Sequence, residues 1–339
     1  MPPAPLDLTR AQILAFRRRV GALDARLPRG ARSLRQAAWA GLQDSMPRAA
    51  LLSIHARVEG TQPSTWEHPS LVQVWGPRFS VFVVPARDHA VFTLARLPDD
   101  ERGRERAEGM AARIQAFLRG RQMTDREVGK GLRVGNWMRY ATSTGTLLIR
   151  WEGARAPVIW TVPRPEIDPL EARRELARRY MHVYGPTTSA AFAKWAGIGA
   201  AEGRAAFDAL GKTLTAVRTP IGDAWILARD EAVLREPAGP PAAARLLPSG
   251  DAYYLLQGAD RELLVPDAVR RGELWTSRVW PGAVLVAGEI AGTWRRAQAK
   301  LTIDSWRRLS RAEREAVELE ARSLPLPGVE GQIVVSWSD

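Results

Sequence analysis

Three times along the chain, a group of short helical stretches is followed by two β-rich runs that are separated by a turn. A pair of such runs is typical of a hairpin, and the three pairs are 72–75 with 80–84, 146–151 with 157–162, and 214–217 with 224–227. The pattern recurs at a period of roughly 80 residues, as in an architectural repeat. An all-helical repeat would not contain these strands, so the sequence predicts an α+β fold.

The first of the three units gives the clearest order of elements. Capping-box patterns that begin at Thr9 and Ser33 predict two helices, of which the second ends near Gln43. A third helix is expected from Ser45 to about Val58. Helix, tight corner, helix and hairpin is the order of a winged helix-turn-helix, which presents its second helix to the DNA major groove and its hairpin to the backbone.

The other two units and the end of the chain complete the predicted organisation. Helices are expected in the second unit near 99–118, as a short helix capped by Thr124-Asp125, and near 136–141, and in the third near 168–184, 187–195 and 200–210. After a Pro- and Ala-rich linker, short strands and one helix at 310–324 predict a small β-rich, barrel-like domain. The predicted domains are modules at 1–98, 99–166 and 167–235, and the carboxy-terminal domain at 245–339.

The charge of the chain favours a polyanionic partner. The formal net charge is +12 and the pI is about 10.9. No basic segment followed by an apolar run opens the sequence, and no run of 18 apolar residues occurs, so we expect neither a signal peptide nor contact with a membrane. The expectation is a monomer that binds double-stranded DNA in the cytoplasm, at the nucleoid.

Several common kinds of site are not expected. Cysteine is absent, which excludes disulfides and thiolate metal sites. The four histidines have no metal-ligand spacing, so we expect no metal. Gly211-Lys212-Thr213 resembles the end of a phosphate-binding loop, but Ala206 replaces the first glycine and the stretch follows a helix. We therefore expect no nucleotide cofactor and no other cofactor.

A set of short motifs, in a fixed order, carries a family resemblance. The motifs are Gly41-Leu42-Gln43-Asp44-Ser45, Leu71-Val72-Gln73-Val74-Trp75-Gly76-Pro77-Arg78, Tyr184-Gly185-Pro186-Thr187-Thr188, Phe192-Ala193-Lys194-Trp195, Asp260-Arg261 and Gly288-Glu289-Ile290-Ala291-Gly292-Thr293-Trp294-Arg295-Arg296. Together they resemble the bacterial winged-helix DNA-binding family that contains the AlkZ/YcaQ-type DNA glycosylases. The likeness runs from about residue 10 to the end, and it implies three tandem winged helices that form a concave scaffold.

The resemblance also implies a catalytic corner. Characterised members carry Gln-Φ-Gln or Gln-Φ-Asp there, where Φ is apolar, and Gln43 matches the first position. Asp44 stands at the apolar position and Ser45 at the third. Gln43 would position a water, with Asp44 as base and counter-charge and Ser45 as a further water ligand. The alternatives are that Asp44 and Ser45 only cap the following helix, and that Gln43 is a buried, hydrogen-bonded amide.

Arginines near the predicted recognition helices are the candidate DNA contacts. Arg48 and Arg57 belong to the first module, and Arg133 and Arg139 flank the equivalent helix of the second. Arg295 and Arg296 match the Trp-Arg-Arg of the resembling family. The alternative for each arginine is a solvated surface position.

Two functions from different classes follow. The first is a monofunctional DNA glycosylase that hydrolyses the N-glycosidic bond of alkylated or bulky purine adducts, including interstrand crosslinks, with Gln43 positioning water. The second is a non-catalytic winged-helix protein that binds DNA or lesions, for instance as a regulator. Gln43 favours the enzyme, whereas the absence of Gln or Asp at the third position favours the binding protein.

Overall fold

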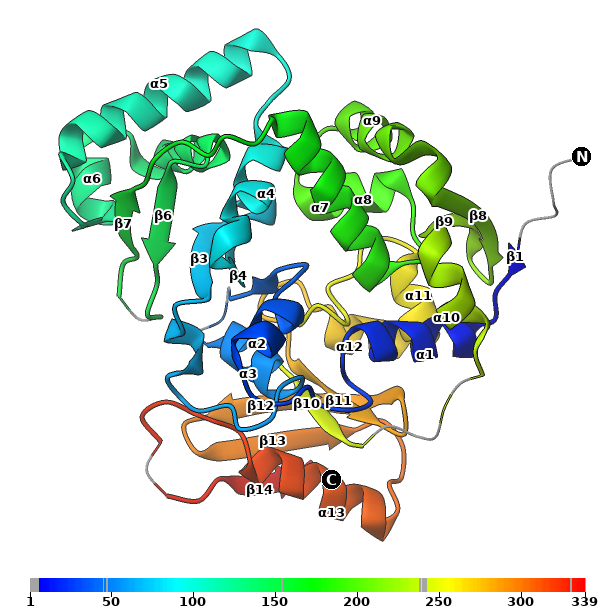
Figure 1. Ribbon diagram of the computed structural model, residues 1–339. Helices are drawn as coiled ribbons and strands as arrows, with labels where there is room; N and C mark the ends of the chain where they lie inside the picture. Colours follow the sequence, from blue (N-terminus) through cyan, green and yellow to red (C-terminus); the bar gives the residue numbers. More distant parts are fainter. Residues whose placement is uncertain are drawn as a thin grey trace, which may run out of the picture.

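Three β-sheets, with helices packed between and around them, organise the computed structural model (Figure 1). It describes residues 6–44, 46, 48–153, 155–237, 239, 243–329 and 331–338. Its strands are β1 (Leu6–Asp7), β2 (Leu42–Gln43), β3 (Leu71–Trp75), β4 (Val81–Pro85), β5 (Met123–Thr124), β6 (Leu147–Arg150), β7 (Val158–Thr161), β8 (Leu214–Thr219), β9 (Gly222–Leu227), β10 (Arg245–Leu247), β11 (Gly282–Val286), β12 (Glu289–Ala297), β13 (Lys300–Ser305) and β14 (Val334–Trp337). The mixed α+β class predicted from the sequence is confirmed.

Helices connect and cover these sheets. The α-helices are α1 (Arg10–Val20), α2 (Ala31–Ala37), α3 (Ala49–His55), α4 (His89–Thr93), α5 (Glu101–Leu118), α6 (Asp125–Leu132), α7 (Pro169–Tyr184), α8 (Ser189–Ala196), α9 (Ala200–Leu210), α10 (Glu231–Arg235), α11 (Asp260–Leu264), α12 (Ala268–Leu274) and α13 (Arg311–Arg322). The residues predicted as a helix at 136–141 lie in a 3₁₀ helix, η5 (Gly135–Thr144). None of the helices in the described ranges is long and apolar enough to cross a membrane.

The first two predicted hairpins are present, and they share one sheet. Its strand order is β2-β4-β3-β6-β7-β5, with β3 and β4 forming the first hairpin and β6 and β7 the second. The two hairpins meet edge to edge, because β3 pairs with β6 through Gln73 and Ile149. The sequence showed each hairpin but gave no sign that they join.

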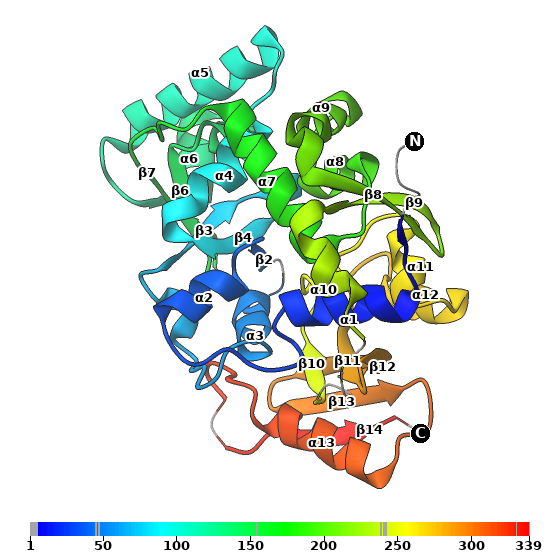
Figure 2. The ribbon, with the colours of Figure 1, turned by 45° about the vertical axis from the view of Figure 1, so that its right-hand side comes forward.

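The third predicted hairpin is also present, in a sheet of its own. Strands β8 and β9 pair along their whole length, and β1 adds parallel to β8 (Figure 2). Ile13 and Phe16 of α1 pack on Val217 and Ile226 of this hairpin. The start of the chain is thereby placed against a hairpin more than 200 residues away in sequence.

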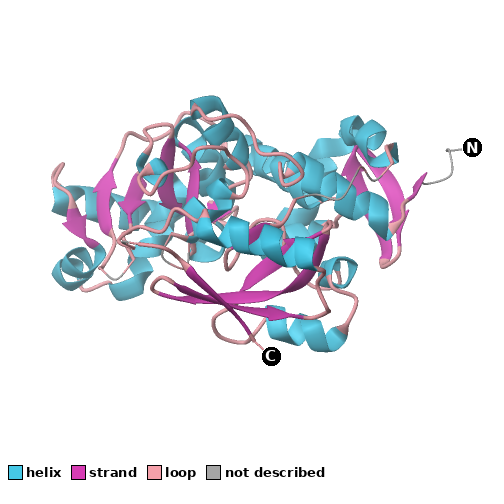
Figure 3. Ribbon diagram, turned by 90° about the horizontal axis from the view of Figure 1, so that it is seen from below, coloured by secondary structure: helices cyan, strands magenta, loops and turns pink. Residues whose placement is uncertain are grey.

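The carboxy-terminal sheet is open, so the barrel-like form predicted for this region is wrong. Its order is β10-β11-β12-β13-β14, and among the described residues β10 and β14 form the two edges. Closure would need β14 to pair with β10, but in the described ranges β14 pairs with β13 alone, in parallel. One face of the sheet packs on α13, where Val317 and Ala321 join the same apolar cluster as Val284 and Ile303 (Figure 3).

The elements around the first corner differ from the prediction. Helix α2 is capped at Gly30 without a side-chain hydrogen bond and ends at Ala37, so the capping box expected at Ser33 is wrong. Gln43 lies in β2 rather than at a helix end, because the chain runs on to the edge of β4. Helix α3 begins only at Ala49. The backbone N–H and C=O groups of β2 form their hydrogen bonds with β4, and they therefore do not need a longer helix as a partner.

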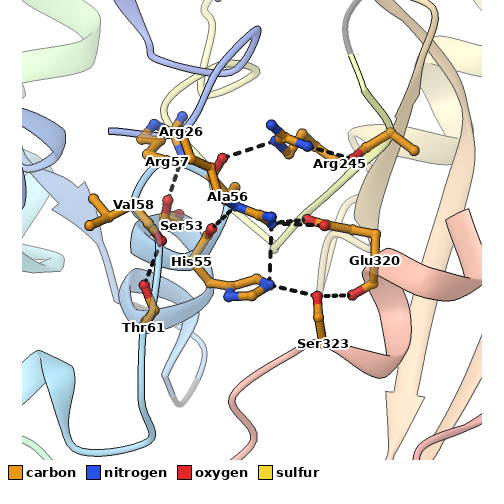
Figure 4. A network of polar contacts seen from close by, with 11 residues as sticks. Arg26, Ser53, His55, Ala56, Arg57, Val58, Thr61, Arg245, Glu320 and Ser323 are labelled. Carbon is orange, nitrogen blue, oxygen red and sulfur yellow. Dashed lines mark hydrogen bonds and ion pairs between the residues drawn. The ribbon is translucent and has the colours of Figure 1, made fainter. Parts of the chain in front are cut away.

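A polar network fixes α3 to the carboxy-terminal region (Figure 4). Arg26 donates to both oxygens of Glu320 at 2.7 Å and to the His55 carbonyl at 2.6 Å. The Nε2 of His55 lies 3.0 Å from the Ser323 hydroxyl and 3.3 Å from Arg26 Nη2. Burial, followed by the charges of Arg26 and Arg245, lowers the pKa of His55 to about 3. His55 is therefore a neutral structural residue.

Candidate active site

Gln43 lies where four segments of the chain meet. Its strand, β2, is paired with β4, and its half-buried side chain projects towards the turn of the first hairpin. There the Oε1 of Gln43 accepts a hydrogen bond from Arg78 Nη2 at 2.8 Å. Gly250, in the segment after β10, approaches so closely that a β-carbon on it would lie 3.2 Å from Gln43 Nε2. Gly250 has φ +73°, which glycine adopts without strain.

Arg78 holds the Gln43 amide from the hairpin turn. It belongs to η2 (Pro77–Phe79) with φ 54°, and its Nη1 also donates to the carbonyl of Trp195 at the end of α8. Burial lowers the pKa of Arg78. The guanidinium therefore bridges Gln43 and the end of α8, and it fixes the direction of the amide.

Asp44 points into the protein interior. Only 1% of its surface is exposed. Its Oδ1 accepts from the backbone N–H of Ala50 at 3.0 Å, and its Oδ2 accepts from Gln73 Nε2 at 2.8 Å. Burial raises the pKa of Asp44 to about 6, against the opposing effects of these hydrogen bonds and of Arg48. Consecutive residues of an extended chain point to opposite sides, so Asp44 turns away from Gln43.

This geometry is that of the capping alternative for Asp44. Ala50 is in the first turn of α3, and its N–H has no partner inside the helix. Because both carboxylate oxygens accept hydrogen bonds from protein donors, the geometry does not favour the predicted role of Asp44 as base and counter-charge. Ser45, the third candidate of this corner, lies outside the described residues.

Gln73 is a site residue that the sequence reasoning missed. It is buried on β3, donates to Asp44, and accepts from the backbone N–H of Trp151 at 2.6 Å. The signal was available, because Leu71, Gln73 and Trp75 share one face of a strand that is buried almost throughout, and a lone amide there needs partners. Gln73 couples the corner to the second hairpin.

Arg48 is held at the same corner rather than projecting freely. Its guanidinium lies 3.6 Å from the centroid of the Trp66 ring, and Nη1 donates to the Trp151 carbonyl at 3.0 Å. Asp44 Oδ2 is 4.0 Å away, and 14% of the Arg48 side chain is exposed. Cation–π contact and the hydrogen bond fix the side chain while a part of its charge still reaches solvent.

Arg57 does not fit the predicted phosphate contact. It is 3% exposed, and its two terminal nitrogens each donate to one oxygen of Asp251 at 2.7 Å. Ser53 Oγ donates to the same carboxylate at 2.6 Å. A cation that is buried and paired in this way is not accessible to a DNA phosphate, so the structure gives Arg57 a structural role.

The remaining predicted arginines are more accessible. Arg133 ends α6 in an exposed position with φ 54°, and Arg139 on η5 lies half-buried, 5.3 Å from the centroid of the Trp75 ring. Arg295 and Arg296 are exposed on β12, where they donate to the backbone carbonyls of Val279 and Gln298. No group of three or more His, Cys, Asp or Glu side chains in the described ranges is placed to share a metal ion.

Comparison with known proteins decides the family. Residues 36–325 match the family model described as DNA glycosylase AlkZ-like. The chain belongs to the AlkZ-like DNA glycosylase family. The resemblance drawn from the sequence motifs is thus confirmed, and the match covers the corner with Gln43, all three hairpins and most of the carboxy-terminal sheet.

A sequence comparison and a structure comparison of the AlkZ-like chain both lead to Streptomyces sahachiroi. A protein named interstrand DNA cross-link repair glycosylase is 30% identical over 161 residues, which are 45% of this chain and 42% of that protein. The aligned part is therefore less than half of the relative's length. The solved structure of the DNA glycosylase AlkZ has a TM-score of 0.79 at 18% identity, covering 98% of this chain and 100% of the other. This second comparison shows a shared fold.

Proposed function

We propose that this AlkZ-like chain is a monofunctional DNA glycosylase, which hydrolyses the N-glycosidic bond of alkylated or bulky purine adducts, including those in interstrand crosslinks. Family membership supports this proposal, and so does the name of the relative that repairs interstrand crosslinks. The single observation that carries it is the position of Gln43, whose amide is oriented by Arg78 at the meeting point of four chain segments.

Hydrolysis of the N-glycosidic bond of an alkylated purine can be catalysed by an amide that has no carboxylate beside it. A purine alkylated at N3 or N7 is already cationic, so its glycosidic bond breaks without an acid on the leaving group. What remains is to hold a water beside the sugar carbon, and a carboxamide suits that purpose because it can both accept and donate hydrogen bonds. Because Asp44 is committed to Ala50 and Gln73, we assign it to support the corner and not to act as the base.

Base release from DNA is the direct test. A duplex with one N7-methylguanine is incubated with excess protein, and abasic sites are revealed by alkaline strand cleavage. Gln43→Ala should lower the single-turnover rate by about 100-fold or more. Gln36→Ala, which removes an exposed amide of α2, should leave the rate unchanged. Equal rates for Gln43→Ala and the parent protein would remove Gln43 from the mechanism.

The buried cap formed by Asp44 also favours a second candidate, a protein that binds DNA or lesions without hydrolysis. Asp44 stands where the catalytic motif of the family has an apolar residue, and the third position of the motif is Ser45. The same experiment separates the two. If the parent protein releases no base while binding the duplex, the enzyme proposal fails and the binding protein remains.

We propose further that the hairpins β3–β4, β6–β7 and β8–β9 act as the wings of three winged-helix modules in a monomer that works on chromosomal DNA in the cytoplasm. The order of helices and hairpins supports this assignment. Arg133, Arg139, Arg295 and Arg296, together with the exposed part of Arg48, are the proposed phosphate contacts. Each alanine substitution at a true contact should reduce the slope of log K against log salt by about 0.9. An unchanged slope for all five would refute this surface.

A further inference from the structure

Three aromatic rings form a ladder that reaches the surface beside the first hairpin. Trp137 on η5 stacks on Tyr140 with 5.5 Å between the ring centroids and 20° between the planes. The ring of Tyr140 in turn packs on the ring of Phe79, with 5.3 Å between the two centroids. The guanidinium of Arg96 lies 4.1 Å from the centroid of the Phe79 ring. We call Trp137, Tyr140 and Phe79 the aromatic ladder.

The inner end of the ladder is fixed next to the candidate active site. Phe79 directly follows Arg78, whose guanidinium donates to Gln43. Arg96 is buried and donates to the carbonyl of Gly76 at 2.5 Å, which ties it to the same turn. The turn that orients Gln43 therefore also anchors the ladder.

The outer end is open to solvent. Trp137 is 57% exposed, whereas its neighbour Met138 is buried in the core of the second unit. Tyr140 covers one face of the indole, so the exposed surface includes the other face. Single exposed apolar residues are ordinary, but this ring is held in place by a stacked partner and needs no reordering before it contacts a ligand.

The charges around the ladder suit a nucleic acid. Arg133 and Arg139 stand on either side of Trp137 in sequence, one exposed and one half-buried. The nearby carboxylate of Asp125 is half-buried, and burial raises its pKa. Aromatic rings next to arginines are the combination with which proteins bind unstacked nucleotides, because every base has a π-face and every nucleotide a phosphate.

We propose that Trp137 stacks on an unpaired nucleobase of bound DNA. Bases inside an intact duplex cover one another's faces, so a ring at the protein surface meets a whole base face most readily where a base has left the stack. This inference rests on the proposed function, since it assigns to that site the recognition of a displaced base near the scissile bond.

Binding to three duplexes tests the proposal. One duplex is intact, one has a single bulged adenosine, and one has the same bulge as a baseless tetrahydrofuran residue. Fluorescence anisotropy should show that the parent protein prefers the base-bearing bulge to the baseless one. Trp137→Ala should reduce the affinity for the base-bearing bulge by about 5- to 150-fold, which is the range of one base–aromatic stack. The salt slope should not change, because no phosphate contact is lost.

Three further variants sharpen this test. Trp137→Phe keeps an aromatic face and should keep most of the preference. Leu319→Ala removes a side chain that is 70% exposed on α13, at the opposite end of the molecule from β6 and β7, and should bind as the parent does (Figure 1). Gln43→Ala should keep the preference even where base release is lost, so failure of hydrolysis and failure of stacking are distinguishable.

Several outcomes would overturn the inference. One is a parent protein that binds both bulges equally. Another is a preference that survives in Trp137→Ala, and a third is an equal loss of affinity by this variant for the intact duplex, which would indicate contact with the backbone instead. An equal loss in Leu319→Ala would show that the effect is not specific to the ladder.

Discussion

Replacing Arg57 by methionine should destabilise the fold without altering contacts to DNA. Arg57 and Asp251 form a buried pair with two hydrogen bonds of 2.7 Å. The carboxylate of Asp251 accepts two more, from Ser53 Oγ at 2.6 Å and from the N–H of Tyr253 at 2.9 Å. Methionine keeps most of the aliphatic volume, so the main effect is to leave the Asp251 charge buried and without its cation.

The size of the effect follows from this arrangement. Removing one partner of a buried ion pair costs about 3–5 kcal/mol. For 339 residues the entropy of unfolding near the midpoint is about 0.7 kcal/mol per kelvin, at about 2.1 cal/mol/K for each residue. Dividing the lost free energy by this entropy gives a decrease of about 4–7 °C in the melting temperature.

Two measurements check the reasoning. Differential scanning calorimetry of Arg57→Met should show the lower melting temperature, and a companion variant, Arg57→Met with Asp251→Leu, should recover a part of it by removing the orphaned charge. The slope of DNA affinity against salt should equal that of the parent protein. A parent-like melting temperature together with a slope that is smaller by about 0.9 would show that Arg57 contacts a phosphate after all.

Three further predictions follow from the corner and from α3. Asp44→Asn should release base within about threefold of the parent rate, because loss of a true general base costs about 10²–10⁴-fold; a larger loss that persists at every pH would make Asp44 catalytic. Arg78→Met should lower the rate by about 10–100-fold at unchanged DNA affinity, and should add nothing to Gln43→Ala; additive losses in the double variant would separate the two residues. The pKa of His55 falls from 6.5 to about 3 on folding, so the unfolded chain binds the extra proton and stability is lost as the pH falls from 6.5 towards 3, by at most about 1.4 kcal/mol per pH unit. The melting temperature of His55→Gln should decline less steeply over this range than that of the parent protein. An identical decline would show that protonation of His55 is not the cause of the loss.

The hairpins could be predicted from the sequence because their signals are local. Each pair of β-rich runs is contiguous with its turn, so strand, turn and strand are all visible in one window of residues. The capping box at Thr9 has the same advantage, and it is present in the structure. Gln43 could be singled out because the family motif lies in five consecutive residues.

The rest depends on partners that are remote in sequence. Arg57 resembled a surface residue because its partner, Asp251, is 194 residues away. Asp44 could be read as a base because its contact with Gln73 spans 29 residues. The strand β2 consists of two residues and exists only because β4 offers an edge. Such pairings follow from tertiary contacts that local propensity does not contain.

The joint between the two hairpins has a consequence for any attempt to divide the protein. Strand β3 lies between β4 and β6, so a fragment that ended before residue 99 would leave one side of β3 bare. Its buried residues Leu71, Val74 and Trp75 would then border a row of unpaired backbone groups, the arrangement that recruits strands from other molecules. An isolated amino-terminal piece would therefore tend to self-associate, whereas a cut placed after the second hairpin would leave this seam closed.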